Sequence, residues 1–286
     1  MTAIWPAPAK LNLFLHITGR RPDGYHTLQT LFQFLDIHDQ LRFEITDDGR
    51  IQRATDLPGV PQAQDLCVRA AQLLQAASGT RQGAIIHLDK RLPAGGGLGG
   101  GSSDAATCLL ALNELWNCGW TRAALADLGL QLGADIPVFV HGETAWAEGV
   151  GEILTPVDVP EQWFVVLAPP VSVSTAQVFA AYDRELDLTP SRAAITIRDF
   201  RAGRSQNDLE SVVRRLVPEV DNALKWLADF GAARMTGSGA CVFLPVADEM
   251  AGASILAQCP KSLASGFVAR GLSRHPLHAC LEIRSN

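Results

Sequence analysis

A glycine-rich segment carries the strongest chemical signal in the sequence. Pro93–Ser103 has glycine at six of its eleven positions and lies between a predicted strand at 84–88 and a predicted helix at 102–116. Positions without side chains let backbone N–H groups approach an anion, and a helix N-terminus adds free donors and the positive end of its dipole. The segment therefore predicts a phosphate-binding loop, with Ser102 or Ser103 capping the helix. A flexible linker is the weaker interpretation, because linkers seldom separate two well-patterned elements.

The loop departs from the two commonest phosphate-binding patterns. A Walker A loop ends in Gly-Lys-Ser/Thr, whereas Ser-Ser-Asp stands at 102–104. Gly95, Gly97 and Gly100 satisfy G-x-G-x-x-G, but a dinucleotide site also needs an acidic residue after a second strand. The sequence there, 117–121, links two predicted helices. The Walker A pattern is excluded, and a dehydrogenase is disfavoured.

Phosphoryl transfer to an alcohol needs a base for the hydroxyl proton and stabilisation of charge around the transferred group. Asp135 has the chemistry of such a base, but its place two residues before Pro137 suits a helix N-cap equally well. Lys10 and Asn12 share one side of a predicted strand over 10–17, since side chains alternate along a strand. By itself, Lys10 is more typical of a solvated strand residue than of a catalytic one.

Three motifs in the chain, taken together, resemble a known signature. Pro8-Ala-Lys-Leu-Asn12, the glycine loop 93–103 and Thr236-Gly-Ser-Gly-Ala240 are similar, in type and order, to the three motifs of the GHMP small-molecule kinase superfamily. The blocks Arg21-Pro-Asp-Gly-Tyr-His26 and 132–139 further resemble the superfamily members that phosphorylate 4-diphosphocytidyl-2-C-methyl-D-erythritol. The match runs from about residue 6 to 245, and the Asp-Gly-Tyr-His block separates it from homoserine, galacto- and mevalonate kinases.

The resemblance implies ATP-dependent phosphorylation, with Mg²⁺, of the 2-hydroxyl of that substrate in non-mevalonate isoprenoid precursor biosynthesis. It implies Asp135 as the general base and Lys10 as the partner that keeps Asp135 ionised and orients the hydroxyl. Ser103 is the candidate metal ligand. The implied ATP-binding residues are Lys90, Pro93, Ala94, Gly95, Gly96, Gly97, Leu98, Gly99, Gly100, Gly101, Ser102, Ser103 and Asp65.

Asp65 departs from the family pattern. Relatives usually have Asp-Asn-Leu before the helix expected at 65–77, whereas this chain has Gln64-Asp65-Leu66. A carboxylate has no N–H to donate to adenine, although Asp65 remains a good helix cap.

Substrate binding is implied for a second set of residues, namely Asn12, Tyr25, His26, Phe179, Gly237, Ser238 and Gly239. An aromatic plane can stack on a pyrimidine, and a neighbouring polar ring can hydrogen-bond to the base edge. From the sequence alone, Tyr25 and His26 could instead pack their turn, Phe179 could be core, and 236–239 could be a plain tight turn before a strand at 241–245.

The fold implied by the resemblance is α+β, a two-domain GHMP kinase fold with the active site in the cleft. The N-terminal domain, 1–155, would be similar to ribosomal protein S5 domain 2, and the C-terminal domain, 156–286, to ferredoxin. The sequence itself predicts a strand–turn–strand opening, a helix at 121–132 and helices at 208–217 and 219–230. The segment 186–206 is predicted to be a surface connection.

The composition of the chain argues against two classes of partner, nucleic acids and membranes. The net charge of −6 and the lack of a basic run argue against nucleic acid, and no apolar stretch approaches the roughly 20 residues of a membrane span. Without a signal-peptide pattern or a C-x-x-C pair, the chain is expected to start near Met1 and to be cytoplasmic with reduced, buried cysteines. We expect a monomer or homodimer, and a solvated surface rather than a metal site at His275-Pro-Leu-His278.

Two rivals stay open: another GHMP kinase acting on a different alcohol, and a catalytically silent nucleotide-binding sensor. Phosphorylation of the cytidyl substrate in preference to homoserine or mevalonate would exclude the first rival. The absence of substrate-dependent ADP release indicates the second.

Overall fold

The computed structural model describes residues 3–186 and 194–278. The strands are β1 (Trp5–Arg20), β2 (His26–Thr46), β3 (Ile51–Arg53), β4 (Gly83–Asp89), β5 (Ala145–Glu148), β6 (Ile153–Pro156), β7 (Trp163–Ala168), β8 (Arg234–Met235), β9 (Val242–Val246) and β10 (Ser265–Leu272). The helices are α1 (Leu66–Ser78), α2 (Gly100–Leu115), α3 (Arg122–Leu130), α4 (Ile136–His141), α5 (Thr175–Leu186), α6 (Ile197–Arg201), α7 (Glu210–Leu216), α8 (Pro218–Ala228) and α9 (Glu249–Ala257), with a 3-10 turn at Gln62–Gln64.

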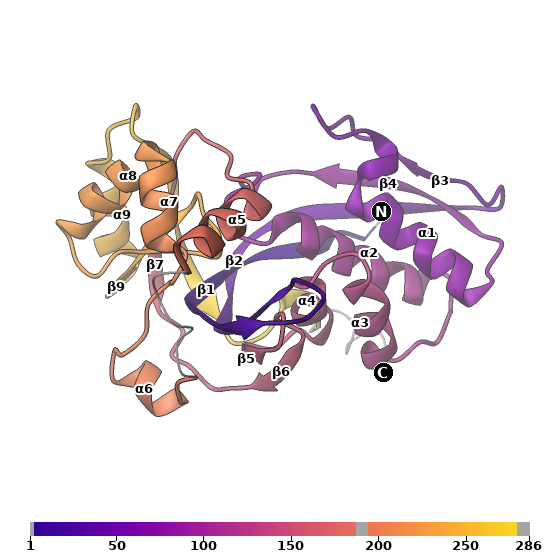
Figure 1. The fold of residues 1–286 in the computed structure, drawn as a ribbon. Coiled ribbons are helices and arrows are strands. Elements are labelled where there is room, and N and C mark those ends of the chain that lie inside the picture. The colour runs from indigo at the N-terminus through magenta and orange to yellow at the C-terminus, as the bar shows by residue number, and fades with distance from the viewer. Residues whose placement is uncertain (1–2, 187–193, 279–286) are drawn as a thin grey trace.

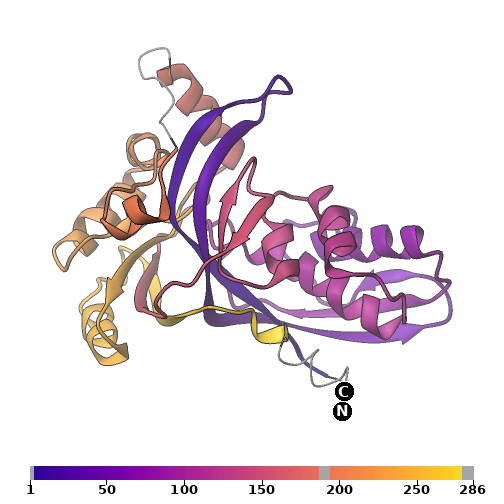
Figure 2. The same ribbon diagram turned by 90° about the horizontal axis from the view of Figure 1, so that it is seen from below.

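A long antiparallel hairpin of β1 and β2 forms the spine of the molecule (Figure 2). The two strands pair from Trp5 opposite Leu41 to Arg20 opposite His26, so the predicted strand–turn–strand opening is confirmed. A bulge between Asn12 and Leu15 interrupts the regular alternation expected over 10–17. Lys10 and Asn12, which precede the bulge, do share a side.

One mixed sheet runs through the described part of the chain in the order β3-β4-β2-β10-β7-β9-β8, with β1 and β5 also paired to β2 and β6 paired to β5. Strand β10 is antiparallel to both β2 and β7. The last strand therefore joins the two halves of the sheet, and residues 271–278, beyond the boundary expected near residue 155, return to the first half.

We call β1–β6 with α1–α4 the first lobe. Its helices pack against the strands around buried side chains that include Phe34, Leu41, Leu74, Leu109 and Phe139 (Figure 1). Burying a side chain of this size stabilises a fold by about 1.5–3 kcal/mol. This apolar packing holds the N-termini of α2 and α4 in place beside β1.

We call β7–β9 with α5–α9 the second lobe. Helices α7 and α8 pack on the strands through Val213, Leu224 and Leu227, against Val165 and Val242. A third cluster, which includes Leu11, Phe14, Leu35, Phe164 and Phe243, joins β1 and β2 to β7 and β9 between the lobes. One hydrophobic cluster therefore connects the two lobes.

The predicted helices at 208–217 and 219–230 are confirmed in α7 and α8. Within the predicted surface connection 186–206, α6 is helical, and residues 187–193 lie outside the described residues.

The segment 275–278 was wrongly predicted to be solvated surface. His275 and His278 are 1% and 5% exposed, and Leu277 lies in the core of the first lobe. The reason is tertiary: the chain leaving β10 runs beneath α4, where the His275 N–H donates to the Gly142 carbonyl at 2.9 Å. Burial lowers the pKa of His275 well below its usual range and that of His278 to about 4, so both rings are neutral at pH 7.

The cysteines of the described chain are all free thiols, and of these Cys67, Cys108 and Cys241 are buried, whereas Cys118 and Cys259 are half-buried. Cys280 lies outside the described residues. Among the described helices, none combines the length and the apolar character that a membrane crossing requires.

Candidate active site

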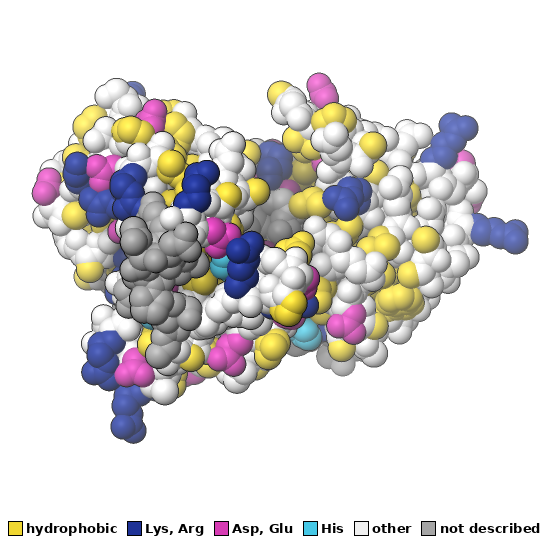
Figure 3. Space-filling view, in the orientation of Figure 1, with side chains coloured by type: hydrophobic (Ala, Val, Ile, Leu, Met, Phe, Trp, Pro, Cys, Tyr) yellow, Lys and Arg dark blue, Asp and Glu magenta, His cyan; other side chains and the backbone are white. Residues whose placement is uncertain are grey.

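A cavity of about 1210 Å³ opens between the two lobes, where Figure 3 shows the surface to be hollowed. The first lobe contributes the glycine loop, the N-termini of α1 and α2, and Asp135. The second lobe contributes α5 and the loop 237–239. Every residue predicted from the sequence to bind ATP or substrate, and both predicted catalytic residues, line this cavity, with the exception of Ser103.

The glycine loop ends at the N-terminus of α2. The N-cap is Gly99, whose φ of 72° is left-handed, and the helix begins at Gly100. No side chain caps it, so the prediction that Ser102 or Ser103 would do so is wrong. The helix begins two residues before the predicted start at 102, and its first three residues, Gly100, Gly101 and Ser102, line the cavity. The N–H groups of a first helical turn have no partner within the helix and suit an anion.

Ser103, the predicted metal ligand, is fully buried one turn into α2 and does not line the cavity. Within residues 3–186 and 194–278, no group of three or more His, Cys, Asp or Glu side chains could hold a metal ion.

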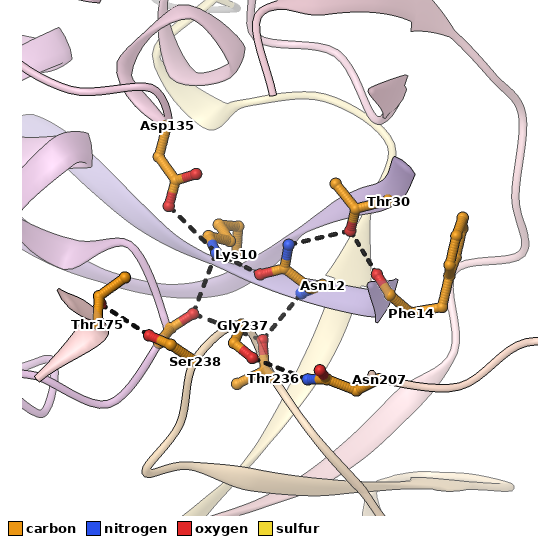
Figure 4. A network of polar contacts seen from close by, with 11 residues as sticks. Lys10, Asn12, Phe14, Thr30, Asp135, Thr175, Asn207, Thr236, Gly237 and Ser238 are labelled. Atoms are coloured by element: carbon orange, nitrogen blue, oxygen red, sulfur yellow. Dashed lines mark hydrogen bonds and ion pairs between the residues drawn. The ribbon is translucent and has the colours of Figure 1, made fainter. Parts of the chain in front are cut away.

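Lys10 and Asp135, which both line the cavity, point toward each other (Figure 4). Lys10 Nζ lies 3.3 Å from Asp135 Oδ2, and its side chain is 3% exposed against 37% for Asp135. Asp135 holds the N-cap position of α4, but its side chain makes no capping hydrogen bond. The carboxylate is directed at the lysine and the cavity. Asp135 is therefore not simply a helix cap.

The ammonium of Lys10 has two further acceptors. It donates to Asn12 Oδ1 and, at 3.1 Å, to the carbonyl oxygen of Gly97 in the glycine loop. The backbone N–H of Lys10 also donates to the Leu98 carbonyl at 2.9 Å. Strand β1 is thereby attached to the glycine loop at the point where Lys10 meets Asp135.

Asn12 connects Lys10 to both lobes. Its Nδ2 donates to Thr30 Oγ1 on β2 at 3.0 Å, and the Thr30 hydroxyl donates to the carbonyl of Phe14. The backbone N–H of Asn12 donates to Thr236 Oγ1, at 2.9 Å, from the second glycine loop. Thr30 belongs to no recognisable sequence motif, because its contact with Asn12 depends on the pairing of two strands.

The second glycine loop, 236–239, is held by buried Asn207. Its Nδ2 donates to the carbonyls of Met235 and Gly237 at 2.9 and 2.8 Å. Gly237 and Gly239 have φ of 57° and 83°, and the Ser238 and Thr175 hydroxyls are 2.8 Å apart. The loop is thus a built part of the cavity wall rather than only a turn.

Lys90 lies in a cluster of charges that the sequence did not reveal. Its Nζ pairs with Asp39 and, at 2.8 Å, with Asp104, both of which are buried. Burial raises the pKa of Asp104 to about 8, with the neighbouring Asp39 adding to the effect and Lys90 opposing it. Burial lowers the pKa of Lys90, but the two carboxylates more than offset this effect and raise the pKa.

Asp39 also accepts hydrogen bonds from the N–H groups of Arg91 and Leu92, and these bonds hold the segment before the glycine loop in place.

Asp65 acts as the cap of α1. One oxygen accepts from the Val68 N–H at 3.1 Å, and the other pairs with Arg53 at 2.7 Å. Asp65 lines the cavity, but its carboxylate is occupied on both sides. The helix-cap role predicted for this residue is confirmed.

The turn of the β1–β2 hairpin meets α5 of the second lobe. The rings of His26 and Phe179 stack with centroids 4.8 Å apart and an interplanar angle of 21°. His26 Nε2 lies 2.6 Å from Asp183 Oδ1, while Tyr25 is 66% exposed. Asp183 follows Phe179 by four residues, one helical turn, so helical spacing could have identified it.

Comparisons with known proteins agree with this geometry. Sequence profiles match the GHMP kinases N terminal domain over residues 65–143 and the GHMP kinases C terminal domain over 193–265. The 4-diphosphocytidyl-2-C-methyl-D-erythritol kinase of Thiobacillus denitrificans is 57% identical over 278 residues, covering 97% of this chain and 98% of that protein. The kinase of the same name from Alkalilimnicola ehrlichii is 58% identical, covering 94% of this chain and 91% of that one.

Solved structures show the same relationship. A crystal structure of 4-(cytidine 5'-diphospho)-2C-methyl-D-erythritol kinase matches with a TM-score of 0.81 and 32% identity, over 94% of this chain and 99% of that chain. A homoserine kinase from Cytophaga hutchinsonii shares the fold, with a TM-score of 0.71 at 18% identity over 95% of this chain and 94% of its own. The predicted α+β GHMP kinase fold is confirmed. From its sequence and its structure, the chain belongs to the 4-diphosphocytidyl-2-C-methyl-D-erythritol kinase family of the GHMP kinases.

Proposed function

We propose that the chain transfers the γ-phosphoryl group of ATP to the 2-hydroxyl of 4-diphosphocytidyl-2-C-methyl-D-erythritol, giving the 2-phosphate and ADP, in non-mevalonate isoprenoid precursor biosynthesis. The names of its relatives support the substrate. The observation that carries the reaction is the Lys10–Asp135 pair, which faces the cavity beside the glycine loop.

ATP would lie along the first lobe. Its phosphates would meet the N–H groups at the start of α2, with the Lys90 ammonium close by, since a Cβ on Gly100 would lie 3.3 Å from Lys90 Nζ. Apolar side chains of Leu57, Val60, Leu66 and Leu88 line the cavity near α1 and β4 and suit the faces of adenine. Asp65, already paired on both sides, would shape this wall rather than bond to the base.

The cytidine end of the substrate would lie between the hairpin turn and α5. Tyr25, His26 and Phe179 line the cavity there. The exposed Tyr25 ring has a free face on which a pyrimidine can stack, and His26 supplies a polar ring edge. The second glycine loop would close the substrate side, with Ser238 hydrogen-bonded to Thr175.

In the transfer step, the substrate hydroxyl oxygen bonds to the γ-phosphorus as the bond from that phosphorus to the leaving oxygen of ADP breaks. Asp135 accepts the hydroxyl proton. Lys10 orients the Asp135 carboxylate before transfer, and the α2 N–H groups stabilise charge on the transferred group. Mg²⁺ would neutralise phosphate charge when it accompanies ATP.

The test is ³¹P NMR of the purified protein with Mg-ATP and 4-diphosphocytidyl-2-C-methyl-D-erythritol, beside Asp135→Asn. A new phosphomonoester signal from the wild type, strongly reduced in the variant, is the expected result. A wild type that binds ATP by calorimetry but forms no such signal overturns the proposed substrate, and other small alcohols such as homoserine and mevalonate are then tried. ATP binding without transfer to any alcohol would indicate a nucleotide sensor.

A further inference from the structure

We propose that Thr30 is a positioning residue for the reaction: its hydroxyl sets the direction of the hydrogen bonds that end at Lys10 and so keeps the Lys10 ammonium directed at Asp135. This inference rests on the proposed function for its effect on turnover. The orientation of the Asn12 amide, by contrast, follows from the hydrogen bonds alone and does not depend on the substrate (Figure 4).

The Thr30 hydroxyl has one proton to donate. The bulge in β1 places the Phe14 carbonyl where it accepts that proton. Thr30 is fully buried on β2 opposite Leu15, and its Oγ1 donates to the Phe14 carbonyl. A carbonyl oxygen can only accept, so the hydroxyl proton is committed there. Toward Asn12, 3.0 Å away, the hydroxyl therefore presents a lone pair.

The lone pair selects one orientation of the Asn12 amide. The NH₂ group must face Thr30, and so the amide oxygen must face Lys10. Lys10 Nζ donates to Asn12 Oδ1 and to the Gly97 carbonyl, and it forms an ion pair with Asp135 Oδ2 at 3.3 Å. These two hydrogen bonds and the ion pair hold the Lys10 ammonium in place beside Asp135.

Without the Thr30 hydroxyl, the orientation of the amide is no longer determined. If the amide turned over, its NH₂ group would face the buried ammonium, and two donors would oppose each other where little water can enter. If it did not turn, the Asn12 Nδ2 and the Phe14 carbonyl would each lose the partner that Thr30 provides. The first arrangement displaces Lys10 from Asp135, and the second removes the contact that holds the Asn12 amide in its orientation toward Lys10. Loss of precise positioning at a reacting centre reduces turnover more than binding.

The first test compares Thr30→Val, which keeps the shape and removes the hydroxyl, with Thr30→Ser, which keeps the hydroxyl. Thr144→Val is the matched control, because Thr144 is also buried and donates to a backbone carbonyl, that of Leu272 at 2.9 Å, but does not line the cavity. We expect Thr30→Val to lower kcat by about 10- to 100-fold with KM for both substrates little changed. Thr30→Ser should restore most of the kcat, and Thr144→Val should lower the melting temperature without lowering kcat.

A kcat for Thr30→Val equal to that of Thr144→Val, or a Thr30→Ser variant as slow as Thr30→Val, would overturn the proposal. If Thr30→Val does not fold, Thr30→Ala is measured against Thr30→Ser in the same way.

A second test needs no catalysis. In ¹H–¹⁵N spectra of the free protein, the side-chain NH₂ signals of Asn12, assigned through Asn12→Asp, should shift in Thr30→Val and return in Thr30→Ser. Unchanged Asn12 signals in Thr30→Val overturn the positioning role even if the wild type proves to phosphorylate a different alcohol. Conversely, an inactive wild type whose Asn12 signals respond as expected contradicts the proposed function and retains the assigned orientation.

Discussion

The sulfur of Cys241 occupies the space beside Gly96: a Cβ built on Gly96 would lie 2.4 Å from Cys241 Sγ, and the next contact outside residues 95–97 would be at 3.7 Å. The Cys241 N–H also donates to the Gly96 carbonyl at 3.0 Å. Burial raises the pKa of the Cys241 thiol to about 12, so the side chain acts as a neutral packing group. The glycine loop of the first lobe thus packs directly against the residue that precedes β9 of the second lobe.

We predict that Gly96→Ala destabilises the protein and weakens ATP binding, and that Cys241→Ala in the same chain restores both. The backbone at Gly96 is not left-handed, so the clash with one sulfur is the only obstacle to a methyl group. Overpacking of this kind costs about 1–3 kcal/mol. Urea unfolding and calorimetric titration with ATP, applied as a double-mutant cycle, measure the effect.

Gly97→Ala is the control for this cycle. Gly97 has φ of 78°, and its added Cβ would lie 2.3 Å from the Thr236 backbone carbonyl. Neither obstacle involves Cys241, so Cys241→Ala should not rescue it. Equal rescue at both positions, or none at Gly96, would contradict the packing explanation.

Asp135→Asn should lower kcat by about 10²- to 10⁴-fold, because the amide cannot accept the hydroxyl proton. The side chain is 37% exposed and makes no capping hydrogen bond, so the melting temperature should change little. Steady-state kinetics and thermal unfolding of the same preparation check both expectations. A variant with near wild-type kcat removes Asp135 from the base role.

Tyr25→Ala should raise KM for the cytidine substrate and leave KM for ATP unchanged. Tyr25 is 66% exposed at the hairpin turn, so its loss should not disturb the fold. Stacking of a base on an aromatic ring contributes about 1–3 kcal/mol, which corresponds to a KM increase of roughly 5- to 150-fold. Tyr25→Phe, which keeps the ring, should behave as wild type. Equal increases in both KM values would contradict the stacking role.

Asp104 should make the folded protein less stable as the pH rises. Burial raises its folded-state pKa to about 8, so its favourable contribution is complete below the unfolded value near 3.9 and is lost as the pH rises through about 8. Asp104→Asn mimics the protonated form. Relative to the wild type, the variant should gain up to about 1.4 kcal/mol of unfolding free energy per pH unit between about pH 5 and pH 8.

The difference in unfolding free energy between the wild type and Asp104→Asn reports on Asp104 alone, because both proteins contain the same histidines. His275 and His278 have lowered pKa values, so their contribution is present above about pH 6.5 and is lost as the pH falls, the opposite direction. Urea unfolding of both proteins at several pH values gives the comparison. A pH-independent difference would mean that Asp104 stays ionised against Lys90.

The sequence by itself determined the features that depend on neighbouring residues. The glycine run 93–103 predicts a phosphate loop because backbone freedom is a local property. The two-residue spacing of Lys10 and Asn12 places them on one side because strand side chains alternate. The order of the three motifs indicated the superfamily, and the blocks 21–26 and 132–139 indicated the family. The family resemblance in turn implied roles for Asp135, Tyr25 and Phe179, which all line one cavity.

Tertiary structure alone decided which distant groups meet. The bulge in β1 brings the Phe14 carbonyl to the Thr30 hydroxyl, and the sheet register places Asp39 against Lys90. The return of the chain beneath α4 buries His275, which no local pattern indicated. Local patterns specify backbone geometry, whereas the partner of a polar side chain depends on strand register and on how helices and lobes pack, and these are properties of the whole chain.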